Sequence, residues 1–398
     1  MPTPATIQRR SDLDWLRVIS VFAVFVFHSG LFFNTMDWHI KNPHTYTSML
    51  IVSFLLALWM MPLIFMISGA SIYYALGARS VGDFIKGRIL RLLVPLVVGI
   101  FTHIALSVYL ERLSHGQFAG TFFAFYRHYF DGLYWWGGNF AWMGLHLWYL
   151  EVLFVFSLVF LPLFLWLKHP LGKRILDRFH SLLAQPYAIY LLALPIMLLQ
   201  IAFNPDTIWT GRSWGGWSLP AYIPFFLYGF FFATHEQVKD SILRLRWLSL
   251  VGGITSILAM FVANQGSAEP TYGTINYVLV FALFGLAAWC LILAIWGFTL
   301  RHLAMRSPLL AYANEAVLPF YILHHTVLLC VGYFVVQSAL PDLVKAILIS
   351  GSTLLIITGL YEFMIRRNNL LRFLFGMKAQ ASQEQRTVLD THQPQPEL

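Results

Sequence analysis

The chain has 398 residues, of which 58% are hydrophobic and only 11% charged, and its mean hydropathy is +0.67. Because a soluble domain carries about twice this share of charged residues, the composition excludes an ordinary soluble protein and indicates a polytopic membrane protein. The net charge of +8 does not indicate nucleic-acid binding, because the basic residues lie in short segments between apolar runs, where they set orientation in the membrane. The two cysteines lie inside apolar runs with neither disulfide nor metal-ligand spacing, so we expect no metal.

Ten apolar runs are long enough to cross a bilayer. In chain order these runs are Trp15–Phe33, Met49–Leu76, Leu92–Leu110, Gly144–Leu167, Tyr187–Phe203, Leu219–Thr234, Trp247–Asn264, Tyr277–Phe298, Leu309–Gln337 and Leu343–Ile365. We therefore predict an all-α bundle of about ten transmembrane helices within residues 1–378. Residues 379–398 are polar and rich in Gln, and we predict a disordered cytoplasmic tail because so few apolar residues cannot form a core.

Basic residues are unequally distributed between the two sides of these runs. With the N-terminus in the cytoplasm, most of the 26 Lys and Arg residues fall in inner segments, and the outer segments hold only Lys41, Arg112, Arg127, Arg212 and Lys345. Cytoplasmic loops of membrane proteins carry such an excess of basic residues. The distribution therefore predicts that both termini are cytoplasmic and that the first run crosses from the inside to the outside.

The first run carries Arg17 near its inner end and His28 near its outer end. Eleven residues make about three helical turns, so the two side chains project from nearly the same face, roughly 16 Å apart along the axis. Ionisable residues within a spanning helix usually mark a pathway or a site, and we expect Arg17 and His28 to line one side of one cavity. The alternative is that Arg17 is a positive-inside anchor and that His28 is a histidine satisfied within the core.

Small residues occur near the inner end of the second run, at Ser68 and Gly69. This position is close to the expected depth of Arg17. Small residues let helix backbones approach closely, so we expect helix packing here, with Ser68 also a candidate for contact with a ligand at that depth. Ser68 as a nucleophile would need an adjacent base, and the sequence shows none at this depth.

The segment that leads into the third run contains Lys86, Arg88 and Arg91 ahead of Pro95. If it is helical, Arg88 and Arg91 share one face, because residues three apart are neighbours on a helix surface. Paired arginine donors suit phosphate, and Lys86 together with a helix N-terminus would add to such an anion site. The alternative is that all three are ordinary positive-inside residues.

Aromatic residues are concentrated in two predicted outer segments. Such residues usually belong to the interfacial belt, but their flat faces can also bind a sugar ring. The candidates for a sugar platform are Trp135, Trp136, Trp148 and Trp214. His146 and Glu151 lie at the outer end of the fourth run, near the expected depth of His28. We expect both to belong to the site, because an ionisable residue inside the membrane usually has a function.

The ninth run combines Pro319, Tyr321 and His324. A proline can kink the helix and free backbone groups that a polar cavity then satisfies. His324 lies near mid-membrane. Two interpretations stay open: it lines the cavity, or it is satisfied within the bundle.

These residues together resemble the integral-membrane acyltransferase family 3, in particular the subgroup of glucan-biosynthesis succinyltransferases of bacterial inner membranes. The resemblance covers about residues 9–377. It rests on Asp14-Trp15-Leu16-Arg17 followed by His28, on Ser68-Gly69, on Arg88-x-x-Arg91 before Pro95, on His146-Leu-Trp148 and on Tyr321-x-x-His324. Glu151 departs from the pattern, because many members have a glutamate five residues after the tryptophan and here it follows Trp148 by three.

The resemblance implies a ten-helix fold in a bacterial inner membrane and an acyl-CoA donor bound from the cytoplasm. It also implies that His28 is the essential catalytic group and that Arg17, Arg88 and Arg91 are functional. We expect an acetyl or succinyl group to be transferred to a hydroxyl of an extracytoplasmic carbohydrate, with His28 as general base, since an imidazole titrates near neutral pH. Whether the acyl group first visits an enzyme residue stays open.

The candidate site residues fall into three groups. The catalytic candidates are His28, Asp14, Glu151 and His324; the donor-binding candidates are Arg17, Arg88, Arg91, Lys86 and Ser68; the acceptor-binding candidates are His146, Trp148, Trp135, Trp136 and Trp214. The expected partners are acyl-CoA, a carbohydrate and the lipid bilayer, with no permanently bound cofactor and no nucleic acid. A homo-oligomer is left open.

A proton-coupled or anion transporter is the alternative function, because it would use the same intramembrane Arg, His and Glu residues. The sequence shows neither inverted repeats nor paired broken helices in corresponding halves, which argues against this alternative.

Overall fold

The computed structural model of the chain describes residues 10–207, 209–264, 270–303 and 305–380. Within these ranges the secondary structure is helical, with no named strand and two isolated bridges, Leu133 with Phe140 and Trp214 with Trp217. The polar tail was predicted for residues 379–398, and residues 381–398 lie outside the described ranges, as does Arg9.

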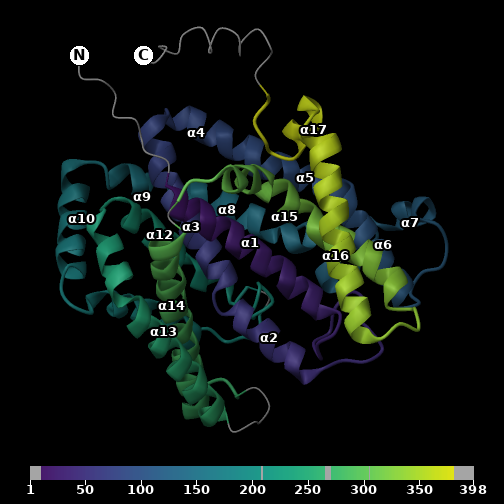
Figure 1. Cartoon of the computed structure of the whole chain (residues 1–398), viewed down its shortest axis with the longest axis horizontal. Helices are drawn as coiled ribbons and strands as arrows, with labels where there is room; N and C mark the ends of the chain where they lie inside the picture. Colours follow the sequence, from purple (N-terminus) through teal and green to yellow (C-terminus); the bar gives the residue numbers. More distant parts are fainter. Residues whose placement is uncertain (1–9, 208, 265–269, 304, 381–398) are drawn as a thin grey trace.

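The longer helices form the body of the molecule (Figure 1). They are α1 (Ser11–Leu31), α3 (Met60–Ala78), α13 (Gln237–Asn264), α14 (Ile275–His302), α15 (Pro308–Val335) and α16 (Asp342–Leu360). Figure 1 shows α1 crossing the middle of the bundle, and it packs against α2, α3 and α15. Helices α13 and α14 form a closely packed pair that projects from one end.

Shorter helices complete the bundle and the connections between the longer ones. They are α2 (Thr47–Ala57), α4 (Val81–Arg88), α5 (Val94–Phe101), α6 (His103–Ser114), α7 (Phe122–His128), α8 (Trp148–Val159), α9 (Leu161–Trp166), α10 (Pro170–Leu183), α11 (Ala193–Ala202), α12 (Tyr222–Ala233) and α17 (Asn369–Leu374). Single turns of 3₁₀-helix occur at Tyr134–Trp136, Leu145–Leu147, Ala188–Leu192 and Leu219–Ala221, and π-helical turns at Ile89–Leu93 and Tyr361–Ile365.

The predicted membrane-spanning runs can be compared with the observed helices. Each predicted run coincides with a helical segment, but in the described part of the chain seven segments are long and apolar enough to cross a membrane. An eighth arises if α10 and α11, bent by 120°, count as one span. The segments Leu145–Val159 and Leu219–Ala233 are apolar but shorter. The chain is therefore a multi-pass helical membrane protein, and ten crossings stay a prediction.

Close backbone contact joins α3 to α12, as the small residues at the inner end of the second run predicted. A Cβ placed on Gly69 would lie 1.9 Å from the carbonyl oxygen of Phe226, and one on Gly229 would lie 1.8 Å from the carbonyl oxygen of Met66. Only glycine allows two helices to approach this closely. Ser68, next to Gly69, is turned toward a cavity instead.

Candidate functional site

A basic cavity of about 670 Å³ opens between α1, α3, α4, α8, α15 and α17. Its charged lining consists of Arg17, Arg79, Arg88, Arg91, Glu315, Arg372 and Lys378. Six of these seven side chains are cationic, so the cavity attracts anions. Four of the five predicted donor-binding residues come together here, namely Arg17 from α1, Ser68 from α3, and Arg88 and Arg91 from α4 and the turn that follows it.

Arg17 is held in place by three neighbours. Its guanidinium donates to Asn314 Oδ1 at 2.9 Å and to Ser71 Oγ at 3.0 Å, and it lies 3.3 Å from Asp14 Oδ1. Asp14 itself is buried in the first turn of α1 and does not line the cavity. Asp14, a predicted catalytic residue, therefore contacts Arg17 and lies outside the cavity.

Arg88 and Arg91 lie within one helical stretch that runs from α4 through a π-helical turn into α5. The turn follows from Pro95, which has no N–H to donate to the carbonyl of Arg91. Neither arginine forms an ion pair or a hydrogen bond with its side chain in the described part of the chain; Arg88 stacks on Phe84, with 4.8 Å from its Cζ to the ring centroid. Both guanidinium groups are therefore available to a ligand.

Two details of the predicted anion site are wrong. The helix begins at Val81, where Ser80 caps it, so its N-terminus lies about two turns from Arg88 and does not contribute. Lys86 is exposed on α4 and does not line the cavity. Helical rotation explains this, since a residue two positions before Arg88 points to a different side.

The other walls of the cavity come from α3, α8 and the C-terminal segment. Ser68 Oγ and Tyr149 OH lie 2.6 Å apart and share a hydrogen bond. Arg372, which is buried, pairs with Glu315 at 2.9 Å and donates to the carbonyl of Lys378 at 2.7 Å. The segment that contains α17 is thereby tied to α15 at the edge of the cavity.

Tyr321 lies at the end of the cavity that faces the histidines. Its ring lines the cavity and also packs against His146 and His324, with centroids 5.9 and 5.7 Å apart, and its hydroxyl donates to the His146 carbonyl at 2.5 Å. His28 does not belong to the lining. The expectation that Arg17 and His28 line one cavity is therefore wrong, because Tyr321 stands between the cavity and His28.

Beyond Tyr321 lies a cluster of five histidine rings, which we call the histidine cluster: His28, His39, His146, His324 and His325. The rings of His146 and His325 stack with centroids 4.5 Å apart, and the centroids of the other contacting pairs in the cluster lie 5.0 to 6.5 Å apart. Helices α1 and α15, the 3₁₀ turn Leu145–Leu147 and the segment between α1 and α2 supply these residues. Two of the predicted site residues, His146 and His324, thus lie beside His28.

Hydrogen bonds assign the protons of the neutral His28–His324 pair. His324 Nδ1 lies 2.6 Å from the Tyr321 carbonyl and must donate to it, because a carbonyl only accepts. Its Nε2 therefore accepts from His28 Nδ1, 3.0 Å away. The remaining nitrogen, His28 Nε2, carries a lone pair, and His28 is partly exposed. The nitrogen of His28 that carries the lone pair is thus the one that does not contact His324.

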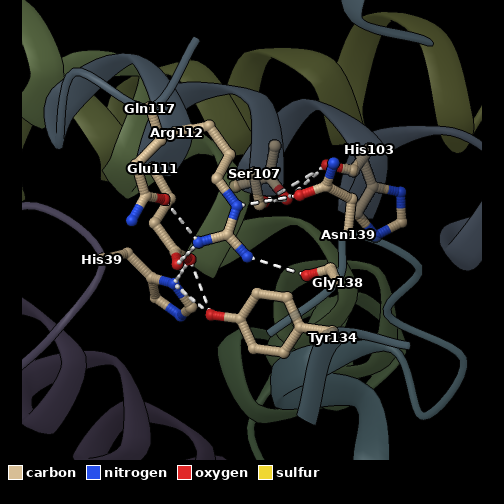
Figure 2. Close-up of polar contacts among 10 residues, drawn as sticks. His39, His103, Ser107, Glu111, Arg112, Gln117, Tyr134, Gly138 and Asn139 are labelled. Carbon is tan, nitrogen blue, oxygen red and sulfur yellow. Dashed lines mark hydrogen bonds and ion pairs between the residues drawn. The ribbon is translucent and has the colours of Figure 1, made fainter. Parts of the chain in front are cut away.

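A charged network adjoins the cluster on the side of His39 (Figure 2). The Glu111 carboxylate contacts His39 Nδ1, accepts from Tyr134 OH at 2.7 Å and pairs with Arg112 at 3.2 Å. Burial, with Glu111 close by, raises the pKa of the Tyr134 hydroxyl, so Tyr134 stays a donor at neutral pH. Arg112 also bonds Asn139, which holds the segment that carries Tyr134.

Glu151 does not join the histidine cluster. It is partly buried on α8, and its Oε2 is buried without a hydrogen-bond partner in the described part of the chain. It does not line the basic cavity, although Leu150 and Leu153 of the same helix do. Nothing in the structure brings this carboxyl group to His28, which agrees with its departure from the family spacing.

The predicted sugar platform is wrong for one of its tryptophans. Trp214 is 0% exposed: Trp135 and Trp209 stack against it, with centroids 5.4 and 6.0 Å apart, and Trp148 packs edge-on at 5.4 Å. A ring covered in this way cannot stack on a sugar. Trp136 is 64% exposed and Trp135 partly so, and these two keep an accessible surface.

The sequence analysis did not single out several residues that the structure places at these sites. They are Arg79 in the cavity, and His39, Glu111 and His325 in or beside the histidine cluster. Two of them carried a local signal, since Glu111 is an acidic residue at the end of an apolar helix and His325 follows His324. The pairing of His39 with Glu111 joins positions far apart in the chain, which no local pattern indicates.

Comparisons with known proteins give one family match and several curated relatives. A family model described as "Acyltransferase domain" matches residues 10–362. The proteins named glucans biosynthesis protein C from Salmonella paratyphi A and Salmonella agona are each 22% identical to this chain, over 98% of the chain and 99% of their own length. The one from Salmonella dublin is 23% identical over the same shares. No solved structure matches the chain.

Proposed function

The chain belongs to acyltransferase family 3, whose model matches residues 10–362, and is a membrane acyltransferase; from this premise we propose that it transfers an acetyl or succinyl group from cytoplasmic acyl-CoA to a hydroxyl of an extracytoplasmic carbohydrate. Membership of an enzyme family removes the reason to consider a transporter. The observation that carries the proposal is a basic cavity that ends at Tyr321, with the oriented His28–His324 pair on the far side of this ring.

The basic cavity is the proposed donor site. An acyl-CoA carries its phosphates at one end and its thioester at the end of a long arm. Arg79, Arg88 and Arg91 line the cavity without ion-pair or hydrogen-bond partners in the described part of the chain, so they can bind phosphate oxygens through charge-assisted hydrogen bonds. No permanently bound cofactor is needed, because the donor is itself a substrate.

The thioester is proposed to pass Tyr321 and reach His28. His28 Nε2 then takes the proton of the acceptor hydroxyl, the hydroxyl oxygen forms a bond to the thioester carbonyl carbon, and the C–S bond breaks. The proton on His28 passes to the departing thiolate, so the products are an ester and free CoA. His324 holds the His28 ring in the tautomer that this step requires.

A carbohydrate acceptor is supported by two observations. The relatives are named for glucans biosynthesis, and Trp135 and Trp136 keep an accessible aromatic surface in a predicted outer segment. The charge distribution supports both termini in the cytoplasm, so that the cavity opens inward and the histidine cluster lies toward the outside. A bacterial inner membrane is supported by the relatives, which are bacterial proteins.

The test is acyl transfer by purified protein in detergent. We expect acetyl-CoA or succinyl-CoA to acylate a linear glucose oligosaccharide, with ester formation measured by mass spectrometry and CoA release measured as free thiol. His28→Ala should abolish transfer and leave CoA binding unchanged, because the residue lies outside the donor cavity. His115→Ala, an exposed histidine outside the site, is the matched control. Wild-type turnover in His28→Ala would exclude this mechanism.

A further inference from the structure

We propose that His39 and Glu111 form a positioning dyad that stabilises the positive charge created in the histidine cluster when His28 takes up the acceptor's proton. The inference deepens the proposed function and rests on it. It assigns a role to two residues that neither the cavity nor the proposed chemistry at His28 uses, and it predicts a signature in the pH dependence of the reaction.

The dyad is formed by a buried carboxylate and a partly buried imidazole. The side chains of Glu111 and His39 are 8% and 13% exposed, and Glu111 Oε2 contacts His39 Nδ1. The neutral imidazole donates from Nδ1 to the carboxylate, which leaves the lone pair on Nε2. Figure 2 shows the His39 ring directed at the Glu111 carboxylate, with the Tyr134 hydroxyl on the same oxygen. A carboxylate in this position stabilises the protonated form of an imidazole.

His325 connects the dyad to His28. Its ring centroid lies 5.3 Å from that of His28 and 5.0 Å from that of His39. His325 is 1% exposed, and its Nδ1 has no hydrogen-bond partner in the described part of the chain. One imidazole with an unused nitrogen therefore stands between the base and the carboxylate-backed histidine.

The chemistry requires a counter-charge at this place. A cation buried in an apolar bundle is strongly unfavourable unless an opposite charge stabilises it. His324 supplies only a neutral imidazole to His28. In the described part of the chain, Glu111 is the carboxylate in direct contact with a member of the histidine cluster. The dyad is therefore the nearest group that favours the protonated cluster.

The proton balance of the reaction is unchanged by the dyad. The hydroxyl O–H bond breaks and the proton moves to His28; the ester C–O bond forms and the C–S bond breaks; the proton then passes from His28 to the thiolate. Between these two transfers the cluster carries one positive charge. The Glu111 carboxylate lowers the free energy of the positively charged cluster, and no further reactant is needed.

The network around Glu111 also holds the local structure together. The test must distinguish this structural role from the proposed electrostatic one. Arg112 donates to Asn139 Oδ1, to the Gly138 carbonyl and to Gln117 Oε1, each at 2.8 Å, which holds the segment that carries Tyr134 (Figure 2). The charged and titratable groups around His39 are Glu111 and Arg112 from α6, Tyr134 from the segment before α8, His325 from α15, and Asp37 and Lys41 from its own segment. Arg112 opposes protonation of the cluster, whereas Glu111 favours it.

The experiment compares pH–rate profiles of Glu111→Gln, Arg112→Gln and wild type. Acyl transfer from acetyl-CoA or succinyl-CoA to a linear glucose oligosaccharide is the reaction measured. The base must be unprotonated to act, so loss of the carboxylate should move the acidic limb of kcat/KM to lower pH. Because the base is then weaker, the plateau value of kcat/KM in Glu111→Gln should also fall at least about ten-fold. Arg112→Gln breaks the bonds to Asn139, Gly138 and Gln117 that hold the segment with Tyr134, but it removes a positive charge, so it should move the limb to higher pH.

A purely structural role gives a different result. It would reduce the rate in both variants and leave the acidic limb at the wild-type pH, and that outcome overturns the proposal. If Glu111→Gln does not fold, Tyr134→Phe replaces it: this variant removes one donor from the carboxylate and should move the limb to higher pH, and an unmoved limb again overturns the proposal. A wild-type protein that acylates no hydroxyl contradicts the proposed function, whereas an active wild type with an unmoved limb in Glu111→Gln contradicts the dyad alone.

Discussion

At the scale of single residues, the cations of the cavity differ in whether the fold already satisfies them. Arg372 is bonded to Glu315 and to backbone carbonyls, and Arg17 to Asn314 and Ser71, so both have structural partners. Arg88 and Arg91 line the same cavity with no hydrogen-bond or ion-pair partner for their side chains in the described part of the chain. Guanidinium groups without partners can form charge-assisted hydrogen bonds, so a ligand that supplies anionic groups gains most at these two positions.

We therefore predict that Arg88→Ala and Arg91→Ala each weaken CoA binding about ten-fold, since a hydrogen bond to a charged group contributes roughly 1.5–3 kcal/mol. Binding of pantetheine, which has no phosphate, should change little. Calorimetric titration of both ligands measures the difference, and Lys86→Ala, an exposed cation outside the cavity, is the control. Equal losses for both ligands would mean that the arginines serve only orientation in the membrane.

At the scale of elements, the contact between α3 and α12 decides where the cavity wall stands. Gly69 and Gly229 each face a backbone carbonyl of the other helix at a distance that no side chain tolerates. Ser68, one residue from this contact, then points into the cavity and bonds Tyr149 of α8. The packing of two helices thus sets the position of a side chain in the proposed donor site.

Gly69→Ala should lower the free energy of unfolding by about 1–3 kcal/mol, the usual cost of overpacking a tight contact. Gly77→Ala on the same helix is the matched control, because a Cβ there meets nothing within 4 Å. It should be neutral or slightly stabilising, since alanine is the better helix former. Thermal unfolding in detergent measures the stability of both variants. Equal stability of the two would contradict the close contact of α3 with α12 at Gly69.

At the scale of the whole molecule, the proposal needs two sides with different chemistry. The basic cavity is lined by residues of predicted inner segments, such as Arg79 and Lys378. The histidine cluster includes His39, which belongs to a predicted outer segment, and adjoins Tyr134 of another. The molecule is therefore polarised along the route from donor to acceptor. For the acceptor to be extracytoplasmic, the cavity must face the cytoplasm and the histidine cluster must lie toward the outside.

Cysteine labelling in intact cells tests that orientation. With Cys290 and Cys330 replaced by alanine, a single cysteine at Trp136 should react with an impermeant thiol reagent, because Trp136 is 64% exposed in a predicted outer segment. A single cysteine at Lys86, which is also exposed, should react only after the membrane is opened. The reverse pattern would place the donor cavity outside and contradict the proposed direction of transfer.

Local periodicity and charge determined the parts of this protein that depend on neighbours in the chain. Uniformly apolar runs must form helices in a membrane, so the helical segments follow from the sequence, and residues three apart, such as Arg88 and Arg91, share a cavity because the helix repeat places them together. The length of an apolar run does not by itself decide whether the helix crosses the membrane. The number of membrane spans therefore does not follow from the sequence as the helices do. Packing decided the rest, because contacts between distant positions depend on which helix faces meet. Only the tertiary structure places Tyr321 between Arg17 and His28, buries Trp214 among other tryptophans, and brings His39 to Glu111.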